Sequence, residues 1–124
     1  NNLPASSNEM KQDTSAEKWS LGIESDMQSQ NQAYLINFTA AWCITCQTNE
    51  KTALGREKVK EYLAEENITY VKADWTNRNE EIAIGLAKYE RTGSPLYIFW
   101  KPGMRGSKIL PAVLTEDSLI KSMQ

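Results

Sequence analysis

The sequence predicts an α/β domain with a central mixed β-sheet and helices on both of its faces. Apolar segments rich in β-branched and aromatic residues alternate with segments of helical spacing, as is typical of strands joined through helices. The last two apolar segments are separated only by the Gly/Pro turn "KPGMRGS", which indicates a hairpin. A length of 124 residues fits one such domain with a hydrophobic core.

The chain divides into a tail and a domain. Residues 1–15 are polar and show no periodicity, so we expect a flexible tail or linker. Residues 16–124 form the domain. Its expected elements are, in order, a weak helix over 16–32, a strand over 33–40, a helix from Cys43 to about Thr52, a helix over 57–67, a strand over 68–75, a helix over 79–90, strands over 94–100 and 108–114, and a helix over 115–123.

Each expected strand is a short run of β-branched and aromatic residues, and the helices present apolar faces. Those faces consist of Trp19, Ile23 and Met27 in the first helix, Val59, Tyr62 and Leu63 in the third, and Ile82, Leu86 and Tyr89 in the fourth. The stretch "LGREK" interrupts the helix that begins at Cys43. Thr76 or Asn77 is expected to cap the helix over 79–90, and Thr115 to cap the last helix, with Asp117 in its first turn.

Composition excludes several classes of function. The net charge is −2 with scattered Lys and Arg, so no basic stripe for nucleic acid is present. No apolar run approaches the ~20 residues of a membrane span, so we expect the chain as given to be soluble. We also expect the isolated domain to be monomeric. The chain has no histidine, which removes His-based acid–base catalysis, Cys–His nucleophile pairs and His metal ligands. Because it starts without Met or a signal sequence, we expect that it was processed or excised from a longer protein.

The two cysteines, Cys43 and Cys46, allow three explanations. A zinc site needs about four Cys or His ligands, and this chain offers one pair. A structural disulfide across so short a loop stabilises by only about 2 kcal/mol, against about 4.7 kcal/mol for a 100-residue loop. The third explanation is a working dithiol, for which C-x-x-C after a strand and at the start of a helix is the expected context.

We therefore interpret Cys43 and Cys46 as a redox pair and expect no other cofactor and no metal. At a helix N-terminus the Cys43 sulfur meets unpaired backbone N–H groups and the positive end of the helix dipole, both of which favour the thiolate. Cys46 lies nearly one turn further in. We expect Cys43 to be the one solvent-accessible thiol and the nucleophile, and Cys46 to be the resolving thiol.

The segment "FTAAWCITCQTNE" resembles the W-C-x-x-C segment of the thioredoxin superfamily. Three downstream segments narrow the resemblance to the C-terminal thioredoxin-like domain of membrane thiol:disulfide interchange proteins of the DsbD and ScsB type: "VKADWTNRNEEI", "GSPLYIFWKPG" and "ILPAVLT". The resemblance extends from about Trp19 to Met123 and implies a thioredoxin fold with four to five strands.

The resemblance also implies a function and a location. Such a domain is periplasmic and follows a transmembrane domain that carries electrons. It accepts electrons from that domain by thiol–disulfide exchange and passes them to a periplasmic partner thiol domain, as in cytochrome c biogenesis. Residues 1–15 would then be the remainder of a linker.

Three further residues, Pro95, Ser94 and Glu50, acquire expected roles from the resemblance, and Trp42 acquires one from its place beside the cysteines. Pro95 matches the family's cis-proline, which lets the preceding residue, Ser94, face the disulfide and a bound partner. Trp42 adjoins the pair and is expected to contact partners, whereas Trp75 and Trp100 are expected only to pack. Glu50, four residues after Cys46 on the same helix face, matches an acid of the family and is a candidate proton acceptor.

The chain departs from the wider superfamily at several positions. Asn37 replaces the buried Asp that accepts the proton of the resolving thiol, and Lys51 stands near the place of the usual helix-kinking Pro. The intervening pair Ile44–Thr45 contains no imidazole to stabilise the thiolate, which argues against a strongly oxidising domain. Two alternatives stay open: a free-standing oxidase or isomerase, and a redox-inert binding module.

Overall fold

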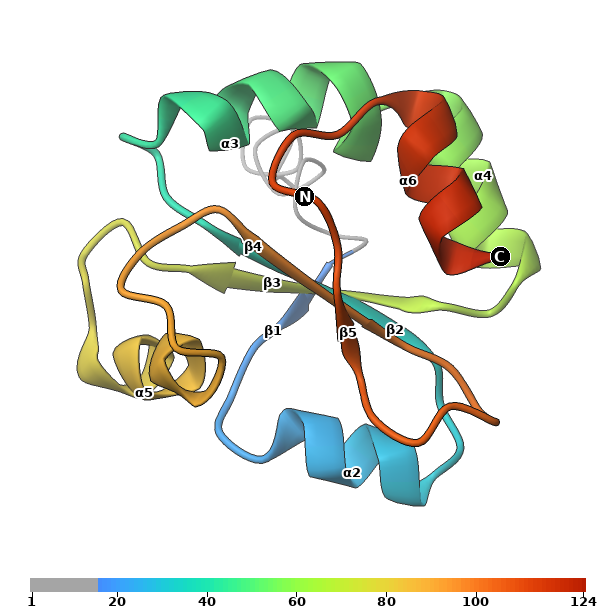
Figure 1. Ribbon diagram of the computed structural model, residues 1–124, viewed down its shortest axis with the longest axis horizontal. Helices are drawn as coiled ribbons and strands as arrows, with labels where there is room; N and C mark the ends of the chain where they lie inside the picture. Colours follow the sequence, from blue (N-terminus) through green and yellow to red (C-terminus); the bar gives the residue numbers. More distant parts are fainter. Residues whose placement is uncertain (1–15) are drawn as a thin grey trace, which may run out of the picture.

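The computed structural model describes residues 16–124, which form a five-stranded mixed sheet (Figure 1). The spatial order is β1-β3-β2-β4-β5, in which β1 and β2 pair in parallel with β3 while β4 is antiparallel to β2 and β5. The bounds are Glu17–Lys18 for β1, Tyr34–Thr39 for β2, Thr69–Asp74 for β3, Leu96–Trp100 for β4 and Lys108–Ile109 for β5. The predicted mixed sheet is confirmed.

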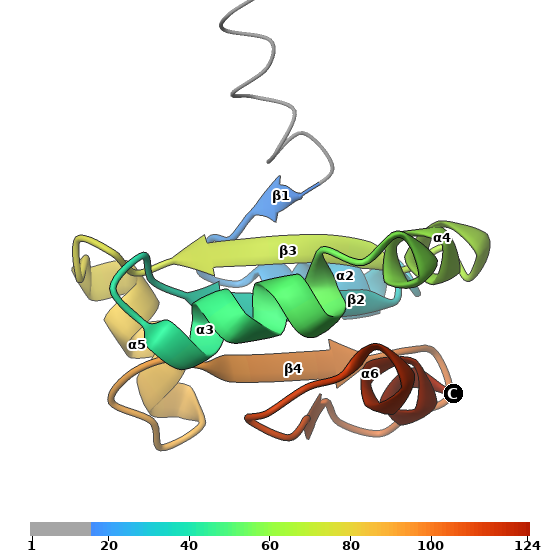
Figure 2. The ribbon, with the colours of Figure 1, turned by 90° about the horizontal axis from the view of Figure 1, so that it is seen from above.

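Helices cover both faces of the sheet, as predicted (Figures 1 and 2). One face carries α3 (Ile44–Asn49), the π-helical turn η1 (Glu50–Leu54), α4 (Glu57–Glu65) and α6 (Glu116–Met123). The other carries α2 (Ile23–Ser29) and α5 (Glu80–Lys88). All residues of β2 and β4 are buried, because a central strand between two helical layers loses water on both sides.

The core is accordingly split by the sheet. Alternate residues of β2 contribute to each half, with Ile36 and Phe38 toward α2 and α5 and Leu35 toward α4 and α6. Two ion pairs, Arg56–Glu116 at 3.5 Å and Lys58–Asp117 at 3.7 Å, join α4 to α6 at the surface.

The helix predicted over 16–32 is wrong over its first part. Residues 17–18 form the edge strand β1, and the helix begins only at Ile23, after Gly22 with a φ of 84°. That left-handed turn breaks the helical spacing between Trp19 and the helix. Trp19 nevertheless lies in one buried cluster with Ile23 and Met27, on the far side of the turn at residues 21–22.

Two further expectations fail at turns. Neither Thr76 nor Asn77 caps α5; Asn79 does, its side chain accepting from Ile82 N at 2.9 Å. Arg78 has a φ of 52° and keeps the preceding residues in a turn. The strand predicted over 108–114 is only β5, since Pro111 has no N–H to continue a ladder.

Both predictions for the start of the last helix, α6, are confirmed. Thr115 caps α6 in a capping box with Ser118, and Asp117 lies in the first turn, both as predicted. No helix within residues 16–124 combines the length and apolar character needed to cross a membrane. The tail predicted for residues 1–15 lies outside the described residues and stays a prediction.

Candidate active site

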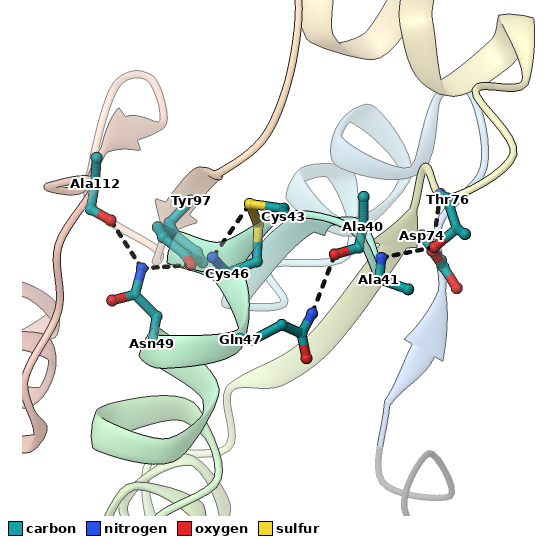
Figure 3. The surroundings of a disulfide bond; sticks show 10 residues. All are labelled: Ala40, Ala41, Cys43, Cys46, Gln47, Asn49, Asp74, Thr76, Tyr97 and Ala112. Atoms are coloured by element: carbon teal, nitrogen blue, oxygen red, sulfur yellow. Dashed lines mark hydrogen bonds between the residues drawn. A yellow bond between two sulfur atoms is a disulfide. The ribbon is translucent and has the colours of Figure 1, made fainter.

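Cys43 and Cys46 form a disulfide at the start of α3 (Figure 3). Cys43 is the N-cap residue, with extended backbone, and its Sγ accepts a hydrogen bond from Cys46 N at 3.1 Å. The predicted position of Cys43 at a helix N-terminus is therefore confirmed. A backbone N–H already points at the sulfur that would carry negative charge after reduction.

The difference in exposure between the two cysteines is smaller than expected. Cys43 is 7% exposed and Cys46 3%, and both pack with Ala40 in a small buried cluster. Cys43 is thus the more accessible residue of the two, but the expectation that Cys43 alone is solvent-accessible is corrected to a small difference, because both cysteines lie in one buried cluster.

Thr76, two residues after the end of β3, holds the loop before the disulfide in place (Figure 3). Its Oγ1 accepts from Ala41 N at 2.9 Å, and its carbonyl accepts from Trp42 Nε1 at 3.0 Å. Asp74 accepts in turn from Thr76 N and Oγ1. The "ADWT" segment therefore positions the segment that carries Cys43, a role that our sequence analysis missed although the motif itself was noted.

Trp42 forms an exposed aromatic and cationic surface beside the disulfide. Its side chain is 45% exposed, and the Arg78 guanidinium lies 4.4 Å from the centre of its ring. Trp75 packs against Trp42 at 6.1 Å and against the core, and Trp100 is buried, so both have the packing role expected of them. The expected contact of Trp42 with partners stays a prediction.

Asn49 anchors the other end of α3 and was also missed. It is fully buried and donates to Tyr97 Oη at 2.8 Å and to the Ala112 carbonyl at 2.7 Å (Figure 3). It also accepts from Leu114 N at 3.0 Å. Every polar atom of its side chain is paired. Its spacing of three residues from Cys46 on the inward helix face is the signal that could have indicated a buried polar anchor.

The Ser94–Pro95 peptide bond is cis, as the family resemblance implied. Ser94 Oγ is buried and has no hydrogen-bond partner within the described chain. Whether Ser94 faces the disulfide stays a prediction. Asn37 is 2% exposed and donates to Tyr70 Oη at 2.9 Å, while its Oδ1 has no partner among residues 16–124. An amide at this position cannot accept a proton at neutral pH.

Glu50 lies at the junction of α3 and η1 and is exposed. It shares a cavity of about 440 Å³ with Cys46, and this cavity runs between α3 and the end of β3. The charged and polar residues that line it are Gln47, Glu50, Lys60, Lys72, Asp74, Thr39 and Thr76. The structure therefore brings Glu50 and the inner cysteine to one polar cavity.

The charge of Glu50 also reaches the core. Burial raises the pKa of Tyr97; the hydrogen bond from Asn49 opposes that rise, and the negative charge of Glu50 adds to it. Glu50 is therefore close enough to influence buried groups beneath α3, even though its own side chain is exposed.

A family model described as thioredoxin-like matches residues 22–102. The chain belongs to this family. The observed domain, with its disulfide at the start of a helix that follows a central strand, has the architecture that the sequence predicted.

Within the thioredoxin-like family, the chain is similar to curated thiol:disulfide interchange proteins. The thiol:disulfide interchange protein DsbD of Yersinia pestis is 32% identical over 88 residues, which is 71% of this chain and 14% of that protein. DsbD of Campylobacter jejuni is 23% identical over 99 residues, which is 80% of this chain and 17% of that protein. The chain thus spans less than a fifth of the length of these relatives.

Solved structures show the same fold. The oxidised C-terminal domain of Neisseria meningitidis DsbD superimposes with a TM-score of 0.67 at 19% identity, covering 86% of this chain and 95% of that one. A thioredoxin from Thermus thermophilus gives 0.65 at 16% identity, covering 87% and 84%. The thioredoxin fold and the resemblance to DsbD are confirmed.

Proposed function

We propose that this domain is a thiol:disulfide reductase that relays electrons from a membrane domain to a periplasmic partner thiol domain. The observation that carries the proposal is the Cys43–Cys46 disulfide, placed at the N-terminus of α3 in a thioredoxin-like domain. The match to DsbD proteins supports the relay and the periplasmic location.

The exchange begins with the reduced pair. The Cys43 thiolate, stabilised by Cys46 N–H, attacks one sulfur of the partner disulfide, and the partner's other sulfur leaves as a thiolate. Cys46 then loses its proton and attacks Cys43 Sγ. The partner leaves with both thiols reduced, and the Cys43–Cys46 disulfide forms. A dithiol of the donor domain restores the reduced pair by the reverse steps.

Glu50 is our candidate for the group that takes the proton of Cys46. Cys46 is 3% exposed, so its thiolate is poorly solvated and deprotonation needs an acceptor. Asn37 cannot serve, whereas the cavity shared by Cys46 and Glu50 offers a polar route, directly or through water.

The test is a redox titration against glutathione, followed by tryptophan fluorescence because Trp42 adjoins the pair. We expect a reduction potential between about −200 and −270 mV, since no imidazole stabilises the thiolate. A value near the roughly −120 mV of a strong oxidant would reject the reductase in favour of an oxidase. A pair that does not exchange with glutathione would indicate a redox-inert module.

A further inference from the structure

The helix that carries the disulfide changes to a π-helical turn at Glu50. In η1 the Gly55 N–H donates to the Glu50 carbonyl at 2.7 Å, a bond that spans five residues instead of four. Thr52 Oγ1 donates to the Leu114 carbonyl at 2.8 Å and fixes the turn to the loop before α6. Lys51, which stands near the place of the proline that kinks related helices, lies within this turn.

Gly55 closes this turn against Glu50. A Cβ at Gly55 would stand 2.7 Å from the Glu50 carbonyl oxygen and 3.1 Å from Oε2 of the Glu50 carboxylate. The backbone φ of Gly55 is −88°, which any residue adopts, so the demand for glycine here is one of space. Gly55 and Glu50 also line the cavity that Cys46 borders.

We propose that Gly55 is a positioning residue for Glu50. Because Gly55 has no side chain, the π-helical turn closes and the Glu50 carboxylate lies close to the glycine; both residues line the cavity that Cys46 borders. This inference rests on the proposed role of Glu50 as acceptor of the Cys46 proton. Gly55 itself takes no part in bond making or proton transfer.

A methyl group at Gly55 would crowd two atoms of Glu50, its carbonyl oxygen and its carboxylate Oε2. The carboxylate is the end of a flexible side chain and can swing away, whereas the carbonyl belongs to the backbone and must move with the turn. In Gly55→Ala both changes withdraw the carboxylate from its present position. Proton transfer from Cys46 then slows, since it depends on the acceptor lying within hydrogen-bond reach, directly or through one water.

The experiment is a double-mutant cycle with Gly55→Ala, Glu50→Gln and the double variant. A mixed disulfide between Cys43 and a peptide with a single cysteine is formed at low pH, where Cys46 stays protonated and does not attack, and a jump to higher pH starts its resolution. Release of the peptide thiol is followed by stopped flow as a function of pH. Gly106→Ala is the matched control, because a Cβ at that glycine meets no atom within 4 Å. Urea unfolding of each variant reports the stability of the fold.

We expect Gly55→Ala and Glu50→Gln each to slow release about three- to tenfold and to flatten its pH profile. In the Glu50→Gln background, Gly55→Ala should change the rate less than about twofold. Equal slowing by Gly55→Ala in both backgrounds would overturn the inference, since the effect would then act through the fold. Slow release in Glu50→Gln but a wild-type rate and pH profile in Gly55→Ala would overturn the role of Gly55 alone.

A wild-type rate in Glu50→Gln would instead remove the proposed role of Glu50 and the inference with it. If Gly55→Ala does not fold, Glu50→Asp provides the second test, because it keeps the charge and leaves Gly55 intact but shortens the side chain by one methylene. Slow release in Glu50→Asp would support the requirement for position. Release at the wild-type rate would overturn it.

Discussion

Asn49→Ala should destabilise the domain strongly, although Asn49 is not expected to take part in the chemistry. The substitution removes three hydrogen bonds, to Tyr97 Oη, to the Ala112 carbonyl and from Leu114 N. A hydrogen bond contributes about 1 kcal/mol net, and a buried donor left without a partner costs about 1–3 kcal/mol. Leu114 is 1% exposed, so its N–H is such a donor, whereas the exposed Ala112 carbonyl can bind water.

The bonds to Tyr97 Oη and the Ala112 carbonyl, at about 1 kcal/mol each, and the unpaired Leu114 N–H, at about 1–3 kcal/mol, together predict a loss of about 3–5 kcal/mol. The assay is urea unfolding of the oxidised domain, read by tryptophan fluorescence. With an m-value of about 2 kcal/mol/M, the midpoint should fall by roughly 1.5–2.5 M. Thr48→Ala, an exposed neighbour on the same helix, is the control and should change stability by less than about 0.5 kcal/mol. A loss below about 1 kcal/mol in Asn49→Ala would show that the buried network does not hold α3 in place.

Three further outcomes concern the thiols and the pH dependence. In Cys46→Ala a mixed disulfide with a partner should accumulate through Cys43 on non-reducing gels; equal trapping by Cys43→Ala would reverse the two roles. Glu50→Gln should shift the 240 nm titration of the Cys43 thiolate to lower pH, because a nearby negative charge opposes the thiolate; an unshifted titration would mean that the Glu50 charge does not reach Cys43. Burial, with the charge of a neighbouring carboxylate, raises the pKa of Tyr34 and of Tyr89 above the ordinary value of 10.0. The folded state therefore holds these phenol protons more tightly than the unfolded state. The contribution of each tyrosine to stability should be constant below about pH 10 and should fall above it, by at most about 1.4 kcal/mol per pH unit. Tyr34→Phe should reduce that slope, and an unchanged slope in urea unfolding would contradict the assignment.

The sequence by itself determined the features that depend on short-range pattern. Apolar runs predicted the central strands β2, β3 and β4, and C-x-x-C after the first of them placed Cys43 at the start of a helix. Thr115 was recognisable as a cap because its partner, Ser118, lies three residues away. The family resemblance added the cis bond at Pro95. In each case the deciding contacts lie within a few residues or follow from a motif.

Only the tertiary structure decided the features that depend on partners distant in the sequence. The two residues of β1 become a strand because β3 offers an open edge, and no local pattern marks them. Thr76 has the side chain of a helix cap, but it holds the disulfide loop because the chain brings Ala41 and Trp42 beside the end of β3. In the sequence Asn49 likewise looks like an ordinary polar residue of a helix, and its role follows only from the partners that the loop before α6 supplies in the folded domain.

The position of the candidate proton acceptor, Glu50, also depends on contacts between residues distant in the sequence. Spacing placed Glu50 on the helix face of Cys46, yet a regular helix gives no indication of the π-helical turn or of the contact with Gly55. The turn depends on Thr52, whose hydroxyl bonds to the carbonyl of Leu114, 62 residues away in the sequence. Local sequence pattern thus determines which helix or strand carries each residue of the site. Long-range hydrogen bonds and packing determine where the side chains of those residues lie.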